Sequence, residues 1–159
     1  QSVAVNVSAV QLHSGLLVQQ VQHALELELT ESALIDGEEK VRPTLERLRA
    51  LGVRLAIDDF GTGYSSLSYL QRLPIDRLKI DRSFVMALTP PEAADRSLAA
   101  AVVRIARTLE MDTVAEGVES LDLLPQLRAL GCDMVQGYAI ARPMPADALL
   151  DWLRQARGA

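Results

Sequence analysis

Short apolar runs alternate with helical segments along the whole chain. The runs are rich in Val, Ile and Leu and cover residues 2–7, 26–29, 54–57, 77–80, 113–115 and 134–140; runs of this kind are typical of buried strands. Between them apolar residues recur at helical spacing, as at Val41, Leu45 and Leu48, where the pattern ends at Gly52. The alternation predicts parallel βαβ units, and hence either an open doubly wound sheet or a barrel.

The strand-like runs are too few for a complete βα barrel. A βα barrel takes eight strands and about 250 residues, whereas this sequence has 159 residues. The helical stretch 11–25 also runs into the strand-like LELELTES without a Gly, Pro or Asn on which to turn, although helix-to-strand connections usually take about 2–6 residues. We therefore expect that residues are missing from this sequence between the first helix and Glu28.

The composition indicates a soluble domain that binds no DNA or RNA polymer. Apolar residues make up 49% of the chain, and the net charge is −5 with no Lys/Arg run, which gives no attraction to nucleic acid. The sequence contains no apolar stretch of membrane-spanning length and no basic signal-peptide start. We expect a cytoplasmic location, which is compatible with a membrane anchor elsewhere in the full-length protein.

Polar or ionisable residues stand at the carboxyl end of every strand-like run. They are Asn6, Glu28, Glu31, Asp58, Asp59, Lys79, Asp81, Glu116, Glu119 and Gln136. In parallel βα folds these ends meet at one face, where sites are built. Several carboxylates on one rim repel one another unless a divalent cation lies between them. Oxygen ligands suit Mg²⁺ or Mn²⁺, whereas one cysteine and two histidines away from these ends are too few for zinc.

The segment DDFGTGYSS at 58–66 places two acids together. Consecutive residues on a regular strand point to opposite faces, so Asp58 and Asp59 would not both face one ion. Gly61 and Gly63 are predicted to let the backbone bend after the pair, which would bring both acids to the rim. The alternative is that an acid before a Gly-rich segment caps a turn or helix, a role that the serines of the same segment fill more naturally.

Seven segments resemble the EAL domain, the family of cyclic di-GMP phosphodiesterases. They are NVS at 6–8, ELTES at 28–32, DDFGTGYSSL at 58–67, LPIDRLKIDRSF at 73–84, AEGVE at 115–119, GCDMVQGY at 131–138 and ARP at 141–143. The resemblance implies a modified TIM-type (β/α) barrel with one antiparallel strand. It also implies hydrolysis of cyclic di-GMP to linear pGpG with two Mg²⁺ or Mn²⁺ ions.

The resemblance also implies a role for each matching residue. Metal ligands would be Asn6, Glu28, Asp58 and Glu116, with Asp59 as a bridging ligand of the second metal; catalytic residues would be Lys79, Glu119 and Gln136; Glu31 would steady the 58–66 loop. Two roles stay open for Lys79. It would take a proton from the attacking water if nearby metals lower its pKa, or it would orient the water and stabilise charge.

The chain departs from the family pattern at its start. No EAL tripeptide occurs in it, and the family has more residues between the positions of Asn6 and Glu28. We therefore expect residues 1–159 to be about the C-terminal two-thirds of an EAL domain. The missing signature Glu is a metal ligand in the family, so the isolated chain is expected to lose activity.

Three functions follow as alternatives. The first is an active phosphodiesterase, the second a catalytically inactive cyclic di-GMP receptor or signalling module, and the third a solvated acidic rim used only for association. The intact acidic motifs favour the enzyme. The resemblance implies a homodimer that pairs through a regulatory loop made of Phe60, Gly61, Thr62, Gly63, Tyr64, Ser65 and Ser66. Upstream sensor or GGDEF-type domains are further expected partners.

The sequence gives the least information about which residues would contact guanine. Arg142 and Ser68 are candidates for this contact. Arg77 and Arg82 flank a strand and are predicted to make surface pairs.

Overall fold

The computed structural model describes residues 3–7, 25–31, 38–61, 70–88 and 97–156. Twelve elements follow one another in the order β1 (Val3–Val7), β2 (Leu25–Thr30), α4 (Glu38–Ala50), β3 (Arg54–Phe60), β4 (Arg77–Ile80), α6 (Arg82–Met86), α7 (Leu98–Thr108), β5 (Asp112–Ala115), the 3₁₀ turn η2 (Leu121–Leu123), α8 (Leu124–Leu130), β6 (Met134–Val135) and α9 (Ala146–Ala156). Strands and helices alternate as predicted from β2 to β3 and from β4 onward, whereas the helical stretches predicted at 11–25 and around Leu67 lie wholly or mostly outside the described residues. None of the described helices has the length and apolarity needed to cross a bilayer.

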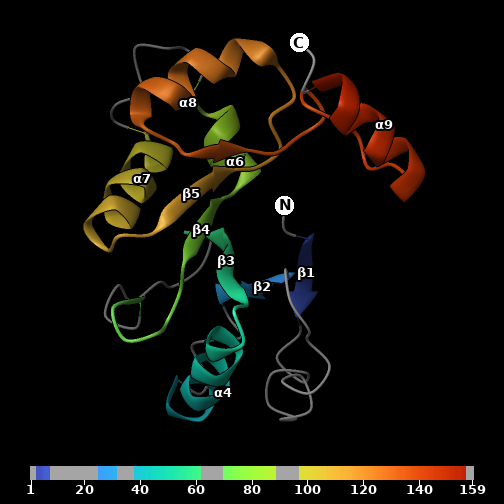
Figure 1. Ribbon diagram of the computed structural model, residues 1–159. Coiled ribbons are helices and arrows are strands. Elements are labelled where there is room, and N and C mark those ends of the chain that lie inside the picture. The colour runs from blue at the N-terminus through green and yellow to red at the C-terminus, as the bar shows by residue number, and fades with distance from the viewer. Residues whose placement is uncertain (1–2, 8–24, 32–37, 62–69, 89–96, 157–159) are drawn as a thin grey trace.

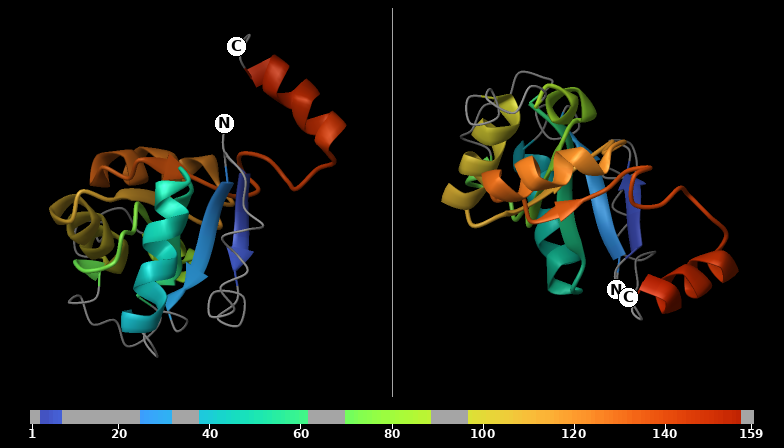
Figure 2. Two further views of the ribbon diagram at one scale, coloured as in Figure 1. Left: turned by 60° about the horizontal axis from the view of Figure 1, so that its bottom comes forward. Right: turned by 90° about the horizontal axis from the view of Figure 1, so that it is seen from above.

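The six described strands form one sheet in the order β1-β2-β3-β4-β5-β6, and every neighbouring pair is parallel. A doubly wound sheet reverses its strand order at a switch point, whereas this order never reverses, as in a βα barrel. The strands follow an arc with α4, α7 and α8 on its outer side (Figure 1), and α9 lies apart from the sheet (Figure 2). The antiparallel strand of the family is not among these six strands.

Helix α4 shows how the helical pattern produces the core. Val41, Leu45 and Leu48 lie on the buried stripe and are at most 1% exposed. The helix ends at Ala50, and Gly52 follows with a φ of 84°, a left-handed conformation that glycine adopts without a Cβ clash. The helix boundary predicted from Gly52 is confirmed.

The last strand is much shorter than predicted. The apolar run at 134–140 predicts a strand of that length, but β6 ends at Val135. A turn replaces the rest, in which Ile140 N donates to Gly137 O at 3.0 Å and Ala139 N donates to Val118 O at 3.0 Å. The apolar run therefore reflects packing of a turn against the 116–119 segment rather than a longer strand.

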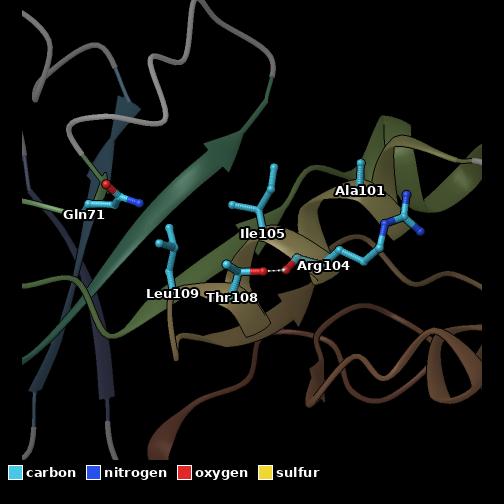
Figure 3. Close-up of a pocket in the computed structure, with 6 residues that line it drawn as sticks. All are labelled: Gln71, Ala101, Arg104, Ile105, Thr108 and Leu109. Atoms are coloured by element: carbon cyan, nitrogen blue, oxygen red, sulfur yellow. Dashed lines mark hydrogen bonds between the residues drawn. The ribbon is translucent and has the colours of Figure 1, made fainter.

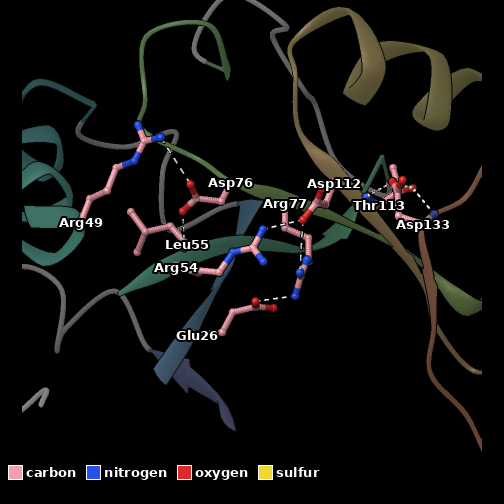
Figure 4. Close-up of polar contacts among 9 residues, drawn as sticks. All are labelled: Glu26, Arg49, Arg54, Leu55, Asp76, Arg77, Asp112, Thr113 and Asp133. Carbon is pink, nitrogen blue, oxygen red and sulfur yellow. Dashed lines mark hydrogen bonds and ion pairs between the residues drawn. The ribbon is translucent and has the colours of Figure 1, made fainter. Parts of the chain in front are cut away.

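A partly buried ion-pair network lies at the amino end of the sheet (Figure 4). Arg77 is 7% exposed and pairs with Glu26 from β2 and with Asp112 at 3.3 Å. Arg54 reaches the same Asp112 oxygen at 2.5 Å. The prediction of a surface pair for Arg77 is therefore wrong, because its side chain is buried together with that of Glu26. The prediction holds for Arg82, whose exposed guanidinium lies 2.8 Å from Glu119.

Candidate active site

Lys79 lies at the centre of a carboxylate cluster. Its side chain is 4% exposed, and the Nζ atom contacts three acids: Glu28 Oε2 at 2.8 Å, Asp58 Oδ1 at 2.9 Å and Glu116 Oε1 at 2.6 Å. These acids come from β2, from β3 and from the residue after β5. Parallel strands in sequential order bring these positions to one end of the sheet, so residues far apart in the sequence surround one ammonium group.

The two adjacent acids share this site through a bulge. The register between β3 and β4 shifts between Ile57 and Phe60, and Asp59 has a φ of 51°. A bulge adds a residue to one strand and re-aims its side chains, and Asp tolerates the left-handed region better than most residues. The backbone thus departs from strand geometry at Asp59 and also at Gly61, whose φ is 94°. The bend predicted at Gly61 is present but begins two residues earlier, and Gly63 lies outside the described residues.

Carboxylate oxygens of Asp58, Asp59 and Glu116 lie within 4.8 Å of one another. Burial raises the pKa of Asp59, and the nearby Asp58 and Asp81 raise it further. Burial also raises the pKa of Glu116, although its hydrogen bond to Lys79 acts in the opposite direction. Crowded, partly desolvated acids of this kind fit a divalent cation, which would favour their charged forms.

Lys79 already occupies the position of a cation among these acids. Burial lowers the pKa of Lys79, but its hydrogen bonds to Glu116, Glu28 and Asp58 outweigh that effect and raise the pKa well above its ordinary value. The three carboxylates therefore favour the charged form of the Lys79 ammonium group. The role of Lys79 as a base depends on bound metals, so both roles given by the sequence stay predictions.

A cavity of about 350 Å³ adjoins the cluster. Its lining includes Asp59, Asp81, Arg82, Glu116, Gly117, Glu119, Gln136, Gly137 and Tyr138. Gln136 is held by its backbone, since its N–H donates to Ala115 O at 2.8 Å and its carbonyl accepts from Val118 N at 3.1 Å. Glu119 also lines the cavity and pairs with Arg82. Both residues predicted as catalytic beside Lys79 therefore face this cavity, but neither contacts the ammonium group.

Asp81 is a residue of the site to which sequence reasoning gave no role. Its carboxylate caps α6 by accepting from Ser83 N at 2.9 Å. Hydrogen bonds from Ser83 lower the pKa of Asp81, and a hydrogen bond with Asp59 acts in the same direction. Its place two residues after Lys79, at a strand end, was the signal that could have identified it.

Glu31 makes the predicted contact with the 58–66 loop, in the part of the loop that the structure describes. Gly61 N donates to Glu31 Oε2 at 3.3 Å, and Phe60 is 2% exposed. A Cβ on Gly61 would come 2.9 Å from the Phe84 ring, so the loop begins in close contact with α6. Thr62, Gly63, Tyr64, Ser65 and Ser66, together with Ser68, lie outside the described residues, and the dimer loop stays a prediction.

Asn6 is placed by its backbone. It lies in β1 directly beside Glu28 of β2 in the parallel register. The strand ends predicted to share a site are thus neighbours in the sheet.

A second cavity of about 350 Å³ on α7 is chemically different (Figure 3). Its lining residues are Gln71, Ala101, Arg104, Ile105, Thr108 and Leu109. No carboxylate belongs to this set, and the Thr108 hydroxyl already donates to the Arg104 carbonyl at 2.9 Å. The acidic cavity is therefore the candidate active site.

Comparison with known proteins indicates the same family as the sequence motifs. The family model described as "EAL domain" matches residues 1–143. Cyclic di-GMP phosphodiesterase NbdA of Pseudomonas aeruginosa is 49% identical over 98% of this chain and 21% of its own length. The bifunctional diguanylate cyclase/cyclic di-GMP phosphodiesterase MucR of the same species is 45% identical over 94% of this chain and 23% of its own length.

Solved structures share the fold as well. The MucR phosphodiesterase in complex with c-di-GMP superposes with a TM-score of 0.81 at 43% identity, covering 93% of this chain and 64% of the other. The EAL domain of Mycobacterium smegmatis DcpA gives a TM-score of 0.86 at 37% identity, covering 97% and 73%. The chain spans about a fifth of the length of the two curated relatives. With its acidic strand ends and its sequential parallel sheet, the chain belongs to the EAL domain family.

Proposed function

We propose that the chain carries the active site of a cyclic di-GMP phosphodiesterase that produces linear pGpG with two divalent cations, Mg²⁺ or Mn²⁺. The observation that carries the proposal is the set of three carboxylates around the Lys79 ammonium, at 2.6–2.9 Å. The names of the relatives and the c-di-GMP complex of MucR support the choice of substrate.

The donor set fits two neighbouring hard cations. Glu28, Asp58 and Glu116 would hold one ion together with Asn6. Asp59 would bridge to a second ion, for which Asp81 is an additional oxygen donor. When bound, such ions polarise phosphoryl oxygens and lower the pKa of water.

The side chains of this chain would then position the phosphodiester and the water. The Lys79 ammonium, which contacts three carboxylates at 2.6–2.9 Å, would donate hydrogen bonds to the attacking water or to a phosphoryl oxygen. Gln136 and Glu119 line the cavity beside the carboxylate cluster and would orient water there. Attack by water at one phosphorus with departure of the 3′ oxygen opens the ring and leaves a 5′ phosphate and a 3′ hydroxyl, which is pGpG.

The test is turnover of cyclic di-GMP by the domain with its native N-terminal extension, followed by chromatography. Metal-dependent pGpG that disappears with a chelator is the expected result. Glu116→Gln should lower kcat by at least about 100-fold, whereas Asp151→Asn, at a side chain 68% exposed on α9, should not change it. Tight binding without turnover would overturn the enzyme and support the receptor. Sedimentation velocity on the same sample tests the homodimer.

A further inference from the structure

Two ion pairs with the same diagonal geometry join β2 to β4 across β3. Glu26 and Glu28 lie two residues apart on β2, and Arg77 and Lys79 lie two residues apart on β4. Alternate residues of a strand share a face, so all four side chains lie on the face that carries the candidate active site. Arg77 binds Glu26 (Figure 4), and Lys79 Nζ lies 2.8 Å from Glu28 Oε2. The first pair is therefore the layer directly beneath the second.

Ala56 of β3 lies between Arg77 and Glu28. In the register of the sheet Ala56 pairs with Glu28 on one side and with Arg77 on the other, and it is fully buried. Neighbouring strands lie about 4.8 Å apart, so the backbones of Glu28 and Arg77 are about 10 Å apart, which an arginine and a glutamate side chain can span together. Arg77 nevertheless reaches back to Glu26, two residues closer to the amino end of β2.

Glu26 holds the Arg77 guanidinium more strongly than Asp112 does. The Glu26 and Arg77 side chains are only 5% and 9% exposed, so water screens their attraction little. Asp112 is 43% exposed, and its Oδ2 atom, 3.3 Å from Arg77, also lies 2.5 Å from Arg54. The buried Nε atom of Arg77 has no hydrogen-bond partner in the part of the chain that the structure describes. Without Glu26 the guanidinium would turn to another buried carboxylate, and Glu28 lies beside it in the register.

A guanidinium bound to Glu28 would occupy oxygens that the site needs. It would compete with Lys79 and with a divalent cation for the same carboxylate. We infer that Glu26 is a positioning residue of the metal site: by binding Arg77, it keeps that guanidinium away from Glu28. The inference rests on the proposed function for the role of Glu28 as a metal ligand, and it concerns a residue that would touch neither metal nor substrate.

The test is the dissociation constant of Mn²⁺, measured by electron paramagnetic resonance of the unbound ion, for the domain with its native N-terminal extension. Glu26→Gln should raise this constant at least about tenfold, the lower end for residues that support a metal ligand. Arg77→Met should not raise it, because this substitution removes the competing cation. The double variant Glu26→Gln/Arg77→Met should return close to the parent value. Arg49→Met, which breaks an exposed ion pair to Asp76, is the matched control.

A purely structural role of the ion pair gives a different pattern. If the pair only held the strands together, Glu26→Gln and Arg77→Met would weaken Mn²⁺ binding alike, and the double variant would not recover. That pattern, or an unchanged dissociation constant in Glu26→Gln, would overturn the inference. Where Arg77→Met alone fails to fold, recovery in the double variant decides.

Turnover of cyclic di-GMP separates the two proposals. The expected Mn²⁺ pattern in a domain that does not hydrolyse cyclic di-GMP would overturn the phosphodiesterase and support the role of Glu26. Turnover by the parent with equal Mn²⁺ affinity in the parent and Glu26→Gln would do the reverse. A parent protein that binds no Mn²⁺ would overturn both.

Discussion

Replacing Lys79 by methionine should destabilise the metal-free protein strongly. The substitution keeps the volume of the chain but removes the charge that neutralises Glu28, Asp58 and Glu116, whose side chains are only 10%, 18% and 16% exposed. Removing one partner from a buried ion pair typically costs about 3–5 kcal/mol. We expect a loss of that size in the free energy of unfolding, measured by urea denaturation with a chelator at pH 8.

The loss should depend on pH and on metal. Without Lys79 the three carboxylates repel one another. Glu116 loses the hydrogen bond that lowers its pKa, so the pKa of Glu116, already raised by burial, rises further above its unfolded value. The penalty is therefore full at high pH and is relieved as pH falls through the raised values, so the variant should lie closer to the parent at pH 5 than at pH 8. Saturating Mg²⁺ or Mn²⁺ should also recover part of the loss, about 2.7 kcal/mol at 100 times the dissociation constant.

Lys40→Met is the matched control, because Lys40 is an exposed lysine on α4. Its effect should stay within about 0.5 kcal/mol. Equal effects of the two substitutions, or a Lys79→Met loss that neither low pH nor metal reduces, would refute the reasoning that Lys79 acts as the cation of the site.

Three further predictions follow from other parts of the chain. Gly137→Ala should raise the KM for cyclic di-GMP in steady-state assays, because its Cβ would overlap the backbone of Val118 and displace the turn that carries Tyr138; an unchanged KM would contradict this. A hydrogen bond from Arg54 is the main cause that lowers the pKa of Asp112, so this carboxylate stabilises the fold above about pH 4 and the contribution is lost as pH falls further. Asp112→Asn should therefore lower the free energy of unfolding at pH 7 and make it depend less on pH in the acid range. The same pH dependence in the variant and the parent would contradict this. Leu45→Ala, at a fully buried core position, should cost about 2–5 kcal/mol in urea denaturation.

The bulge at Asp58 and Asp59 shows where sequence reasoning stopped. The pattern predicts that both acids share a site and that strand geometry opposes this. It assigns the solution to the glycines that follow, because glycine is the usual sign of an unusual backbone. Gly61 does have a positive φ, but Asp59 has one as well, because the register of β3 against β4 is set by pairing between strands, which no local pattern records.

The sequence by itself determined the alternating βα architecture, the sorting of acids to strand ends and the family. Each of these follows from local periodicity or from the order of short motifs along the chain. Only the tertiary structure decided that Lys79 is the shared partner of three acids, that Arg77 is buried, and that Tyr138 and Arg142 stand together beside the acidic cavity. Those facts depend on distances between segments far apart in the chain, which are fixed by sheet register and by packing between neighbouring elements.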